Sequence, residues 1–241
     1  MPELRVHNLP QQIAPEALAL STVVVIDLLR ATSTICQALA AGATEVVPFL
    51  EIDEAFAAAA ADRANIVLGG ERHGHRIEGF DLGNSPSEYT PGTVGGKRVF
   101  ITTTNGTRAL YHARQAKRVL AGSFLNLSAL VVSVQNAPRV EFLCAGTDGV
   151  ESREDILAAG AMLEKLLDKP GAEWQLDSGA KNALHEWQSR GSDLAVELRT
   201  TPGGSNLLEI GHDHDLIDCA RTDALTVVPE LDVAAWRITA R

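Results

Sequence analysis

The chain of 241 residues lacks the features that mark several classes of protein. It has only three cysteines, Cys36, Cys144 and Cys219, and their odd number and wide spacing exclude a disulfide framework and favour a reducing compartment. Its first residues do not have the shape of a secretory signal, and no apolar run approaches the length of a membrane span. We therefore expect a cytoplasmic protein with no membrane partner.

Positive charge and aromatic side chains are also scarce. Lys and Arg total 21 against 31 Asp and Glu, which gives a formal net charge of −10, and aromatic residues make up 5% of the chain. This charge balance disfavours nucleic acid as a partner. Hydrophobic residues still make up 45%, so we expect a sizeable core of aliphatic side chains. A small anionic substrate would then need a local cationic site or a metal ion.

Three motifs of nucleotide and ester chemistry are missing. A P-loop is not completed, because Gly95-Gly96-Lys97 is followed by Arg98 rather than by Ser or Thr. No expected strand is followed by G-x-G-x-x-G, and the chain has no G-x-S-x-G nucleophile elbow. Asp27 also lacks the second aspartate, two residues on, that many aspartyl phosphatases carry. The function must therefore be sought in other residues.

Short apolar runs alternate with helical patterns along the chain. The runs that predict strands are 23–26, 45–50, 66–70, 98–101, 118–122, 140–144 and 224–229. Segments between them, such as 51–63, 126–134 and 152–167, predict helices. This alternation predicts one α/β domain over residues 1–241, with three α/β/α layers and a largely parallel or mixed sheet.

Two stretches share the same order of elements. Strand, polar turn, helix and strand run from 25 to 48 and again from 100 to 121. An old duplication would give sub-lobes 1–95 and 96–241, although ordinary α/β alternation produces similar patterns. After Pro170-Gly171 the chain changes character, and we expect short helices punctuated by a break at 203–206.

The loop 71–86 follows the predicted strand 66–70 and is long for a plain connector. It holds three carboxylates, two arginines and three glycines. Ligands of open α/β sheets bind beyond the carboxyl ends of strands, so the loop is predicted to be functional. Its end also fits a capping box, in which Ser85 caps a helix and Glu88 reaches back. Ser152 and Asp155 form a second start of this kind.

Polar residues follow four of the predicted strands and should meet at one edge of the sheet. They are Asp27 with Arg30, Thr32 and Ser33; Glu71 with Arg72; Thr104, Asn105, Gly106 and Thr107; and Gly146, Thr147 and Asp148. Glycine turns and helix N-termini favour anions there, and Arg30 and Arg72 add forked donors suited to phosphate or sulfonate. Asn84 and Ser85 complete the predicted substrate-binding set.

The carboxylates near this edge would repel an anion unless a cation intervened. Asp27, Glu71, Asp81 and Asp148 offer the hard oxygen ligands that Mg²⁺ prefers, so they indicate phosphoryl chemistry assisted by Mg²⁺. Asp27 equally fits a plain helix N-cap. As a site residue it fits both a metal ligand and a nucleophile, and we favour the ligand.

Two histidine pairs have the look of metal motifs. They are His73-Gly74-His75 and the pair in His212-Asp213-His214-Asp215. Neither pair has a third fixed ligand in the sequence, so surface residues are the favoured interpretation. Cys144, at a strand end, is expected to be a buried small hydrophobe rather than a nucleophile.

These motifs together resemble the 2-phosphosulfolactate phosphatase family, which is associated with coenzyme M synthesis. The matching segments are 27–34, 69–72, 78–86, 103–110 and 144–147, with looser matches at Glu154-Asp155, Gly160 and around Asp218. The resemblance implies an α/β fold, Mg²⁺ dependence and hydrolysis of a phosphate ester of a small sulfonated acid. Asp27, Arg30, Glu71 and Arg72 are then the predicted catalytic residues.

Two other classes of function share the same anion-binding features. One is a lyase or isomerase acting on a phosphorylated acid, and the other is a non-catalytic binding module for a small anionic metabolite. The second has little use for clustered carboxylates, because they weaken anion binding unless a metal ion is present. The sequence leaves a homo-oligomer open.

Overall fold

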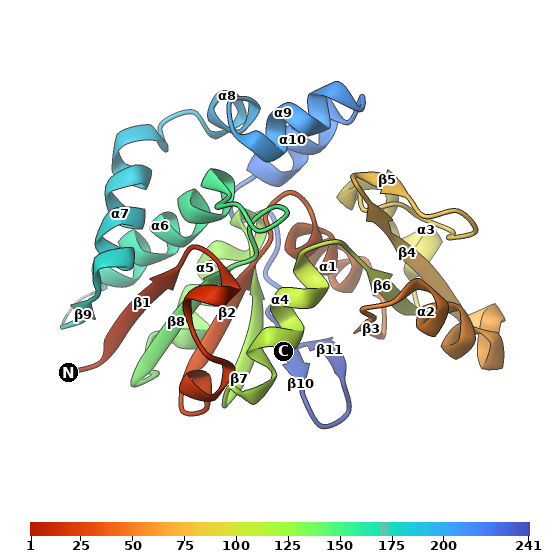
Figure 1. Cartoon of the computed structure of the whole chain (residues 1–241), viewed down its shortest axis with the longest axis horizontal. Helices are drawn as coiled ribbons and strands as arrows, with labels where there is room; N and C mark the ends of the chain where they lie inside the picture. The colour runs from red at the N-terminus through yellow and green to blue at the C-terminus, as the bar shows by residue number, and fades with distance from the viewer. Residues whose placement is uncertain (170, 172) are drawn as a thin grey trace.

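One mixed sheet of eleven strands runs through the computed structural model, which describes residues 1–169, 171 and 173–241 (Figure 1). The strands are β1 Glu3–His7, β2 Thr22–Ile26, β3 Glu45–Pro48, β4 Ile66–Arg72, β5 His75–Arg76, β6 Arg98–Thr102, β7 Arg118–Gly122, β8 Arg139–Cys144, β9 Gln175–Leu176, β10 Pro229–Asp232 and β11 Arg237–Ala240. The expected α/β fold with a mixed sheet is confirmed. Pro170, where a change of character was expected, lies outside the described residues.

Helices surround this sheet. The α-helices are α1 Ala31–Ala40, α2 Ile52–Ala59, α3 Pro91–Val94, α4 Gly106–His112, α5 Leu127–Val134, α6 Arg153–Leu167, α7 Ser178–Arg190, α8 Leu194–Arg199, α9 Pro202–Glu209 and α10 Asp213–Ala220. The 3₁₀ helices are η1 Pro10–Gln12, η2 Pro15–Leu18, η3 Ala60–Asn65, η4 Pro86–Glu88, η5 Ala113–Gln115 and η6 Phe124–Asn126. In the part of the chain described, no helix combines the length and the apolar character that a membrane crossing requires.

The sheet contains two groups of parallel strands, joined by an antiparallel hairpin. One group is β4–β6–β3, and the other is β7–β2–β8–β1–β9. The hairpin β10–β11 lies between β7 and β3. Figure 1 shows the two groups inclined to each other, with β2, β8, β4 and β6 ending towards the centre of the molecule. Strand ends from both groups therefore converge on one place.

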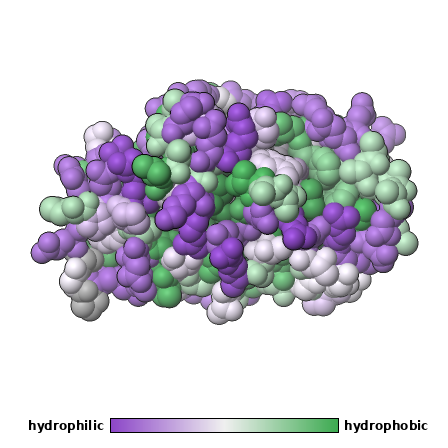
Figure 2. All heavy atoms as spheres, turned by 90° about the horizontal axis from the view of Figure 1, so that it is seen from below, coloured by the Kyte–Doolittle hydropathy of each residue, from purple (hydrophilic) through white to green (hydrophobic). Residues whose placement is uncertain are grey.

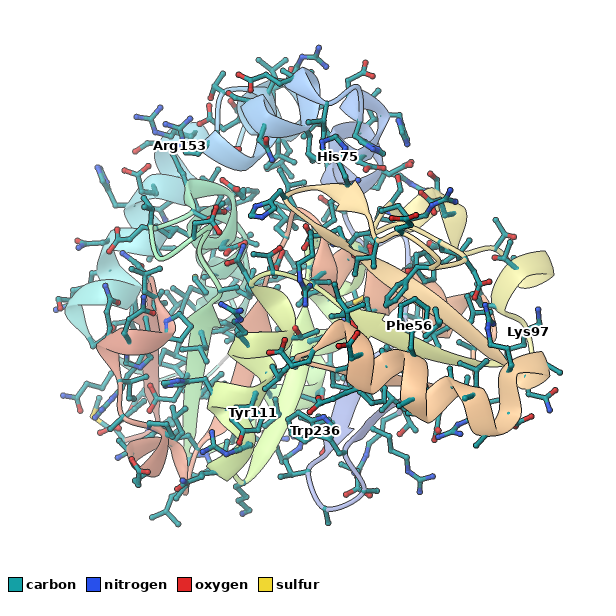
Figure 3. The ribbon with its side chains drawn as sticks, turned by 45° about the vertical axis from the view of Figure 1, so that its right-hand side comes forward. Phe56, His75, Lys97, Tyr111, Arg153 and Trp236 are labelled. Atoms are coloured by element: carbon teal, nitrogen blue, oxygen red, sulfur yellow. The ribbon has the colours of Figure 1, made fainter. Side chains whose placement is uncertain are left out.

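Trp236, at the turn of this hairpin, ties the two groups together. Its indole Nε1 donates a hydrogen bond of 2.8 Å to the carbonyl oxygen of Pro48, at the end of β3. Its ring packs edge-on against Tyr111 of α4, with centroids 5.8 Å apart (Figure 3). The C-terminal hairpin thus completes the sheet rather than extending its edge.

The two faces of β2 build two separate cores. Val24 and Ile26 pack with α5, α6 and α7, whereas Val23 and Val25 pack with α1 and α4. Because β2 is covered on both sides, its residues are all buried, as expected for a parallel strand under two helical layers. Outside these cores, hydrophilic and hydrophobic residues mix over the face seen in Figure 2.

The sequence located most elements, and the exceptions are informative. β1 was missed, because its alternating sequence Glu-Leu-Arg-Val-His resembles an exposed edge, although it lies between β8 and β9. The expected break at 203–206 is wrong, since these residues lie inside α9, which Thr201 caps. The strand expected at 224–229 begins only at Pro229.

The predicted sub-lobes are not separate in the sheet. β6, from after residue 95, pairs with β3 and β4, and β2 pairs with β7 and β8. Each group thus takes strands from both halves of the chain. The duplication itself stays a prediction.

Gly160 should be essential for the packing of α6 on α7. A methyl group there would overlap the carbonyl oxygen of Ala183 and the Cβ of Trp187, both on α7. We expect Gly160→Ala to lower the free energy of unfolding by about 1–3 kcal/mol, because the helices must move apart. Urea denaturation of the parent and the variant measures this change in the free energy of unfolding. Gly92→Ala is the control, since its methyl would meet only Thr90 Oγ at 3.7 Å; equal stability of both variants with the parent would contradict the packing argument.

Candidate active site

A small pocket of about 80 Å³ opens where the strand ends converge. Nine of the residues predicted from the sequence line it: Asp27, Arg30, Glu71, Asn84, Thr104, Asn105, Gly146, Thr147 and Asp148. They come from both groups of strands, so the pocket lies between the groups. Gly203, Asn206 and Leu207 of α9 also line it.

Asp27 follows β2 directly and is buried at the base of this pocket. Its Oδ1 accepts a hydrogen bond of 3.2 Å from the backbone N–H of Ala31, so it does contact the start of α1 as a capping residue would. Burial, together with the negative charges of Glu71 and Glu154, raises the pKa of Asp27 to about 7. Gly106 approaches it closely, since a methyl group there would touch the Asp27 carboxylate.

Glu71, in β4, ties together the two loops on the other side of the pocket. Its carboxylate accepts hydrogen bonds from the backbone N–H groups of Gly74, at 2.8 Å, and Thr104, at 2.7 Å. The Thr104 hydroxyl adds a third, at 3.2 Å. Both oxygens of Glu71 are therefore used to fix the β4–β5 turn and the loop before α4.

Two further carboxylates, Glu154 and Asp155, enter the site from the first turn of α6. Asp155 accepts hydrogen bonds from the backbone N–H groups of Leu28, at 2.8 Å, and Gly146, at 3.1 Å. The predicted capping box at this helix is wrong, because Ser152 makes no capping bond and its Oγ lies 2.8 Å from Thr147 Oγ. In the sequence, the signal for this part of the site was the pair of adjacent acids at the start of the predicted helix 152–167.

The four carboxylates of Asp27, Glu71, Glu154 and Asp155 form a buried acidic cluster. Burial raises the pKa of Asp155 well above its usual value, and the charges of Asp27 and Glu154 raise it further. Burial likewise raises the pKa of Glu154. Among the described residues, Glu154 Oε2 and Asn84 Oδ1 are buried without a hydrogen-bond partner. Hard oxygens in this arrangement suit a divalent cation.

Arg30 is the buried cation of the site. Its Nη1 lies 2.6 Å from Asp215 Oδ2 of α10, and its Nη2 donates a hydrogen bond of 2.7 Å to the carbonyl oxygen of Gly74. Arg30 and Asp215 are almost fully buried. Asp215 could not be assigned a role from the sequence, because its partner Arg30 is 185 residues away.

Ser85 is bound to the same aspartate. Its hydroxyl donates to Asp215 Oδ1 and lies 3.1 Å from His214 Nε2. The predicted capping box is therefore wrong here too: Ser85 makes no capping bond, and Glu88 accepts from the backbone N–H of Gly83 at 2.5 Å. Ser85 thus fastens the end of the loop 71–86 to α10.

Comparison with known proteins agrees with these features. Residues 7–233 match the family model described as 2-phosphosulpholactate phosphatase. The chain belongs to the 2-phosphosulfolactate phosphatase family. It is 42% identical over 212 residues to a probable 2-phosphosulfolactate phosphatase of Caldanaerobacter subterraneus subsp. tengcongensis, with 87% of each chain covered. It is 44% identical over 207 residues to one of Pseudothermotoga lettingae, covering 86% of this chain and 87% of the relative.

A cyanobacterial relative extends the match. A probable 2-phosphosulfolactate phosphatase of Synechococcus sp. strain RCC307 is 41% identical over 231 residues, covering 92% of this chain and 94% of that protein. The expected membership in the 2-phosphosulfolactate phosphatase family is confirmed, and so is the expectation of a phosphoric monoester hydrolase.

Several predicted site residues of this family member lie outside the pocket. Asp81 pairs with Arg63 at 2.6 Å and accepts from the backbone N–H of Leu68 at 2.8 Å. Although burial acts to raise it, these hydrogen bonds lower the pKa of Asp81. Asp81 does not line the pocket, and its carboxylate is engaged by Arg63 and Leu68, so its role as a metal ligand stays a prediction without support from this geometry.

Arg72 and three hydroxyl residues are structural as well. Arg72 donates to the carbonyl oxygens of Glu71, at 2.9 Å, and Leu50, at 3.0 Å. The hydroxyls of Thr32, Ser33 and Thr107 donate to backbone carbonyl oxygens within their own turns, at 2.9 Å each. These hydroxyls support the strand-to-helix turns, and their contact with substrate stays a prediction.

The two histidine pairs differ in position. His73 lines the pocket, whereas His75 is exposed on β5, close to the C-terminal helices (Figure 3). His212 and His214 lie at the start of α10 beside Asp215. Cys144 is buried at the end of β8, as expected, and burial raises the pKa of its thiol.

The acidic cluster predicts a pH dependence of stability in the metal-free protein. A carboxyl whose pKa rises on folding stabilises the fold fully below its unfolded pKa, and this contribution is lost as pH rises through the folded value. For Asp27 the pKa rises from 3.8 to about 7 on folding, so its contribution to stability is lost between these two pH values. We expect the free energy of unfolding, measured in chelator, to fall between about pH 4 and about pH 7, and less steeply in Asp27→Asn.

Asparagine keeps an oxygen that can accept from Ala31 but carries no charge. Asp53→Asn, at an exposed position in α2, serves as the control and should retain the parent slope. Identical pH profiles for the parent and Asp27→Asn would show that Asp27 is not the carboxyl responsible.

Proposed function

We propose that this protein hydrolyses the phosphate ester of 2-phosphosulfolactate to sulfolactate and inorganic phosphate, with Mg²⁺ bound at the acidic cluster. The observation that carries the proposal is the set of four buried carboxylates beside Arg30 in a pocket at the strand ends. Without a cation such a set would repel a phosphate ester. Membership in a phosphatase family supports hydrolysis as the reaction.

Oxygens without a hydrogen-bond partner indicate which residues would hold Mg²⁺. Asp27 offers Oδ2, because its hydrogen bond from Ala31 goes to Oδ1, while Glu154 Oε2 and Asn84 Oδ1 are buried without partners among the described residues. Glu71 and Asp155 have both oxygens occupied by protein donors. We assign the first three as ligands and the other two as residues that hold the loops and add negative charge, with Asp148 at the pocket wall.

The bound ion would supply Lewis-acid chemistry, by neutralising charge that develops on a phosphoryl oxygen. The chain's own donors orient the ester. Arg30 uses two nitrogens for Asp215 and Gly74, which leaves other guanidinium N–H groups for phosphate or sulfonate. Thr104, Asn105 and Thr147 add hydroxyl and amide donors around the same pocket.

Asp27 is better suited to hold the ion than to attack phosphorus. Its charge is unfavourable in this buried position, since the pKa lies near 7, and a bound cation would remove that penalty. Water is then the nucleophile, and no phosphoprotein forms. This completes a hydrolysis whose products are the hydroxy acid and free phosphate.

Phosphate release from 2-phosphosulfolactate, with and without Mg²⁺, tests the function, together with three single variants. We expect Asp27→Asn and Glu154→Gln to need far more Mg²⁺ for half-maximal activity and to turn over slowly, because each loses a hard anionic ligand. Asp81→Asn, which lies outside the pocket, should behave like the parent. Absence of turnover with 2-phosphosulfolactate and related phosphate esters would refute the proposed enzymatic activity. A rearranged phosphorylated product would indicate an isomerase or lyase instead.

Arg30→Lys should not be a mild change. An ammonium cannot contact Asp215 and the Gly74 carbonyl while also presenting a planar fork to an anion. Loss of one charge-assisted hydrogen bond is worth about 1.5–3 kcal/mol, so kcat/KM should fall by roughly ten- to a hundredfold. Arg114→Lys is the matched control, because the guanidinium of Arg114 stacks on the ring of Tyr111, with its carbon 4.1 Å from the ring centroid. Parent-like kinetics in folded Arg30→Lys would remove Arg30 from the site.

A further inference from the structure

A second group of potential metal ligands lies at the start of α10, behind Arg30. Ligand atoms of His212, His214 and Asp215 all lie within 4.8 Å of one another. His212 Nδ1 is 3.6 Å from Asp215 Oδ2, and His214 Nε2 is 3.1 Å from Asp215 Oδ1. The sequence argument against these histidines was that a third fixed ligand was missing, and Asp215 supplies it.

His212 has an unexplained buried nitrogen in this group. Its Nδ1 atom is shielded from solvent and has no hydrogen-bond partner among the described residues. A buried polar atom without a partner costs free energy unless something satisfies it.

We propose that His212, His214 and Asp215 form a second metal site, which takes a transition-metal ion of the Zn²⁺ type rather than Mg²⁺. Two imidazole nitrogens and one carboxylate match the ligands that Zn²⁺ prefers, whereas Mg²⁺ prefers oxygen ligands throughout. The ligands come from one short segment, because His212 and Asp215 are three residues apart at the start of α10. Ser85 Oγ, 3.1 Å from His214 Nε2, lies at the same place.

This site would be linked to the active site through Asp215. The same carboxylate binds Arg30 Nη1 at 2.6 Å and accepts from the Ser85 hydroxyl. A metal ion would compete with the guanidinium for that carboxylate, because two positive charges would then share one aspartate. Occupation therefore weakens the hold on Arg30, which gives the ion an inhibitory effect. This effect rests on the proposed function, whereas binding of the ion does not.

Calorimetric titration of the full chain with Zn²⁺ in excess Mg²⁺ tests the site without any assay of activity. We expect one Zn²⁺ per chain that Mg²⁺ does not displace, and an affinity at least about tenfold lower in the double variant His212→Asn/His214→Gln. Asparagine remains a good residue before a helix, and the half-exposed His214 tolerates glutamine, so the variant should fold. Circular dichroism and a thermal scan confirm this.

His75→Gln/His185→Gln is the matched control, because it removes the same number of imidazoles, both exposed, from β5 and α7. This control should bind Zn²⁺ like the parent. Co²⁺ replaces Zn²⁺ in a second titration, where visible absorption of the bound ion reports imidazole ligation. Three results would each overturn the site: no Zn²⁺ binding by the parent, displacement by Mg²⁺, or unchanged affinity in the α10 variant. Failure of phosphate release would leave this outcome unaffected.

Discussion

Negative charge held away from water is the constraint on which the rest of this structure depends. Asp27, Glu71 and Asp155 each accept hydrogen bonds from backbone N–H groups. Glu71 and Asp155 bond elements distant in sequence, at Thr104 and Leu28. These bonds position α1, the β4–β5 turn, the loop before α4 and the turn after β8. Burial and the charges of neighbouring carboxylates raise the pKa of Asp27 and Asp155. The carboxylates that fix the loops therefore also repel one another. A cation bound as proposed would relieve this conflict, and the residues that hold the loops would then also serve the chemistry.

The site lies between two groups of strands, so contacts that cross between the groups decide its geometry. Arg30, at the start of α1, bonds the carbonyl oxygen of Gly74 in the β4–β5 turn. Asn105, before α4, accepts from the backbone N–H of Asp148, after β8, at 3.2 Å. Within the sheet, the hairpin β10–β11 connects the two groups, and Trp236 adds its hydrogen bond to Pro48. The last residues of the chain are therefore needed for a pocket built mainly from the first two thirds.

The sequence predicted the strands and the residues at their ends well, because buried parallel strands are continuous apolar runs and polar residues directly after them are conspicuous. It could not decide between carboxylates of similar appearance. Asp81 lies in the most distinctive motif, yet Arg63 neutralises it from 18 residues upstream. Glu154 and Asp155 looked like the first turn of an ordinary helix. The difference depends on which elements become neighbours, and local sequence does not contain that information.

The same reasoning explains why both capping boxes failed. Ser85 and Ser152 satisfy the local pattern, but each hydroxyl finds a partner in the site, Asp215 for the first and Thr147 for the second. Glu88 and Asp155 then accept backbone N–H groups elsewhere. For Ser85 the energies explain the choice, because a capping bond contributes only about 1 kcal/mol, whereas a hydrogen bond to a charged group such as the Asp215 carboxylate contributes about 1.5–3 kcal/mol.

Arg30 lies between Asp215 and the acidic cluster. These negative charges offset the cost of burying its guanidinium in the pocket. Asp215 fixes the orientation of Arg30, which also lines the pocket. A chain with a net charge of −10 can in this way present local positive charge to an acidic substrate. In the proposed function, the paired charges at the strand ends would bind the anionic ester, while the negative charge of the whole protein would repel anions elsewhere on its surface.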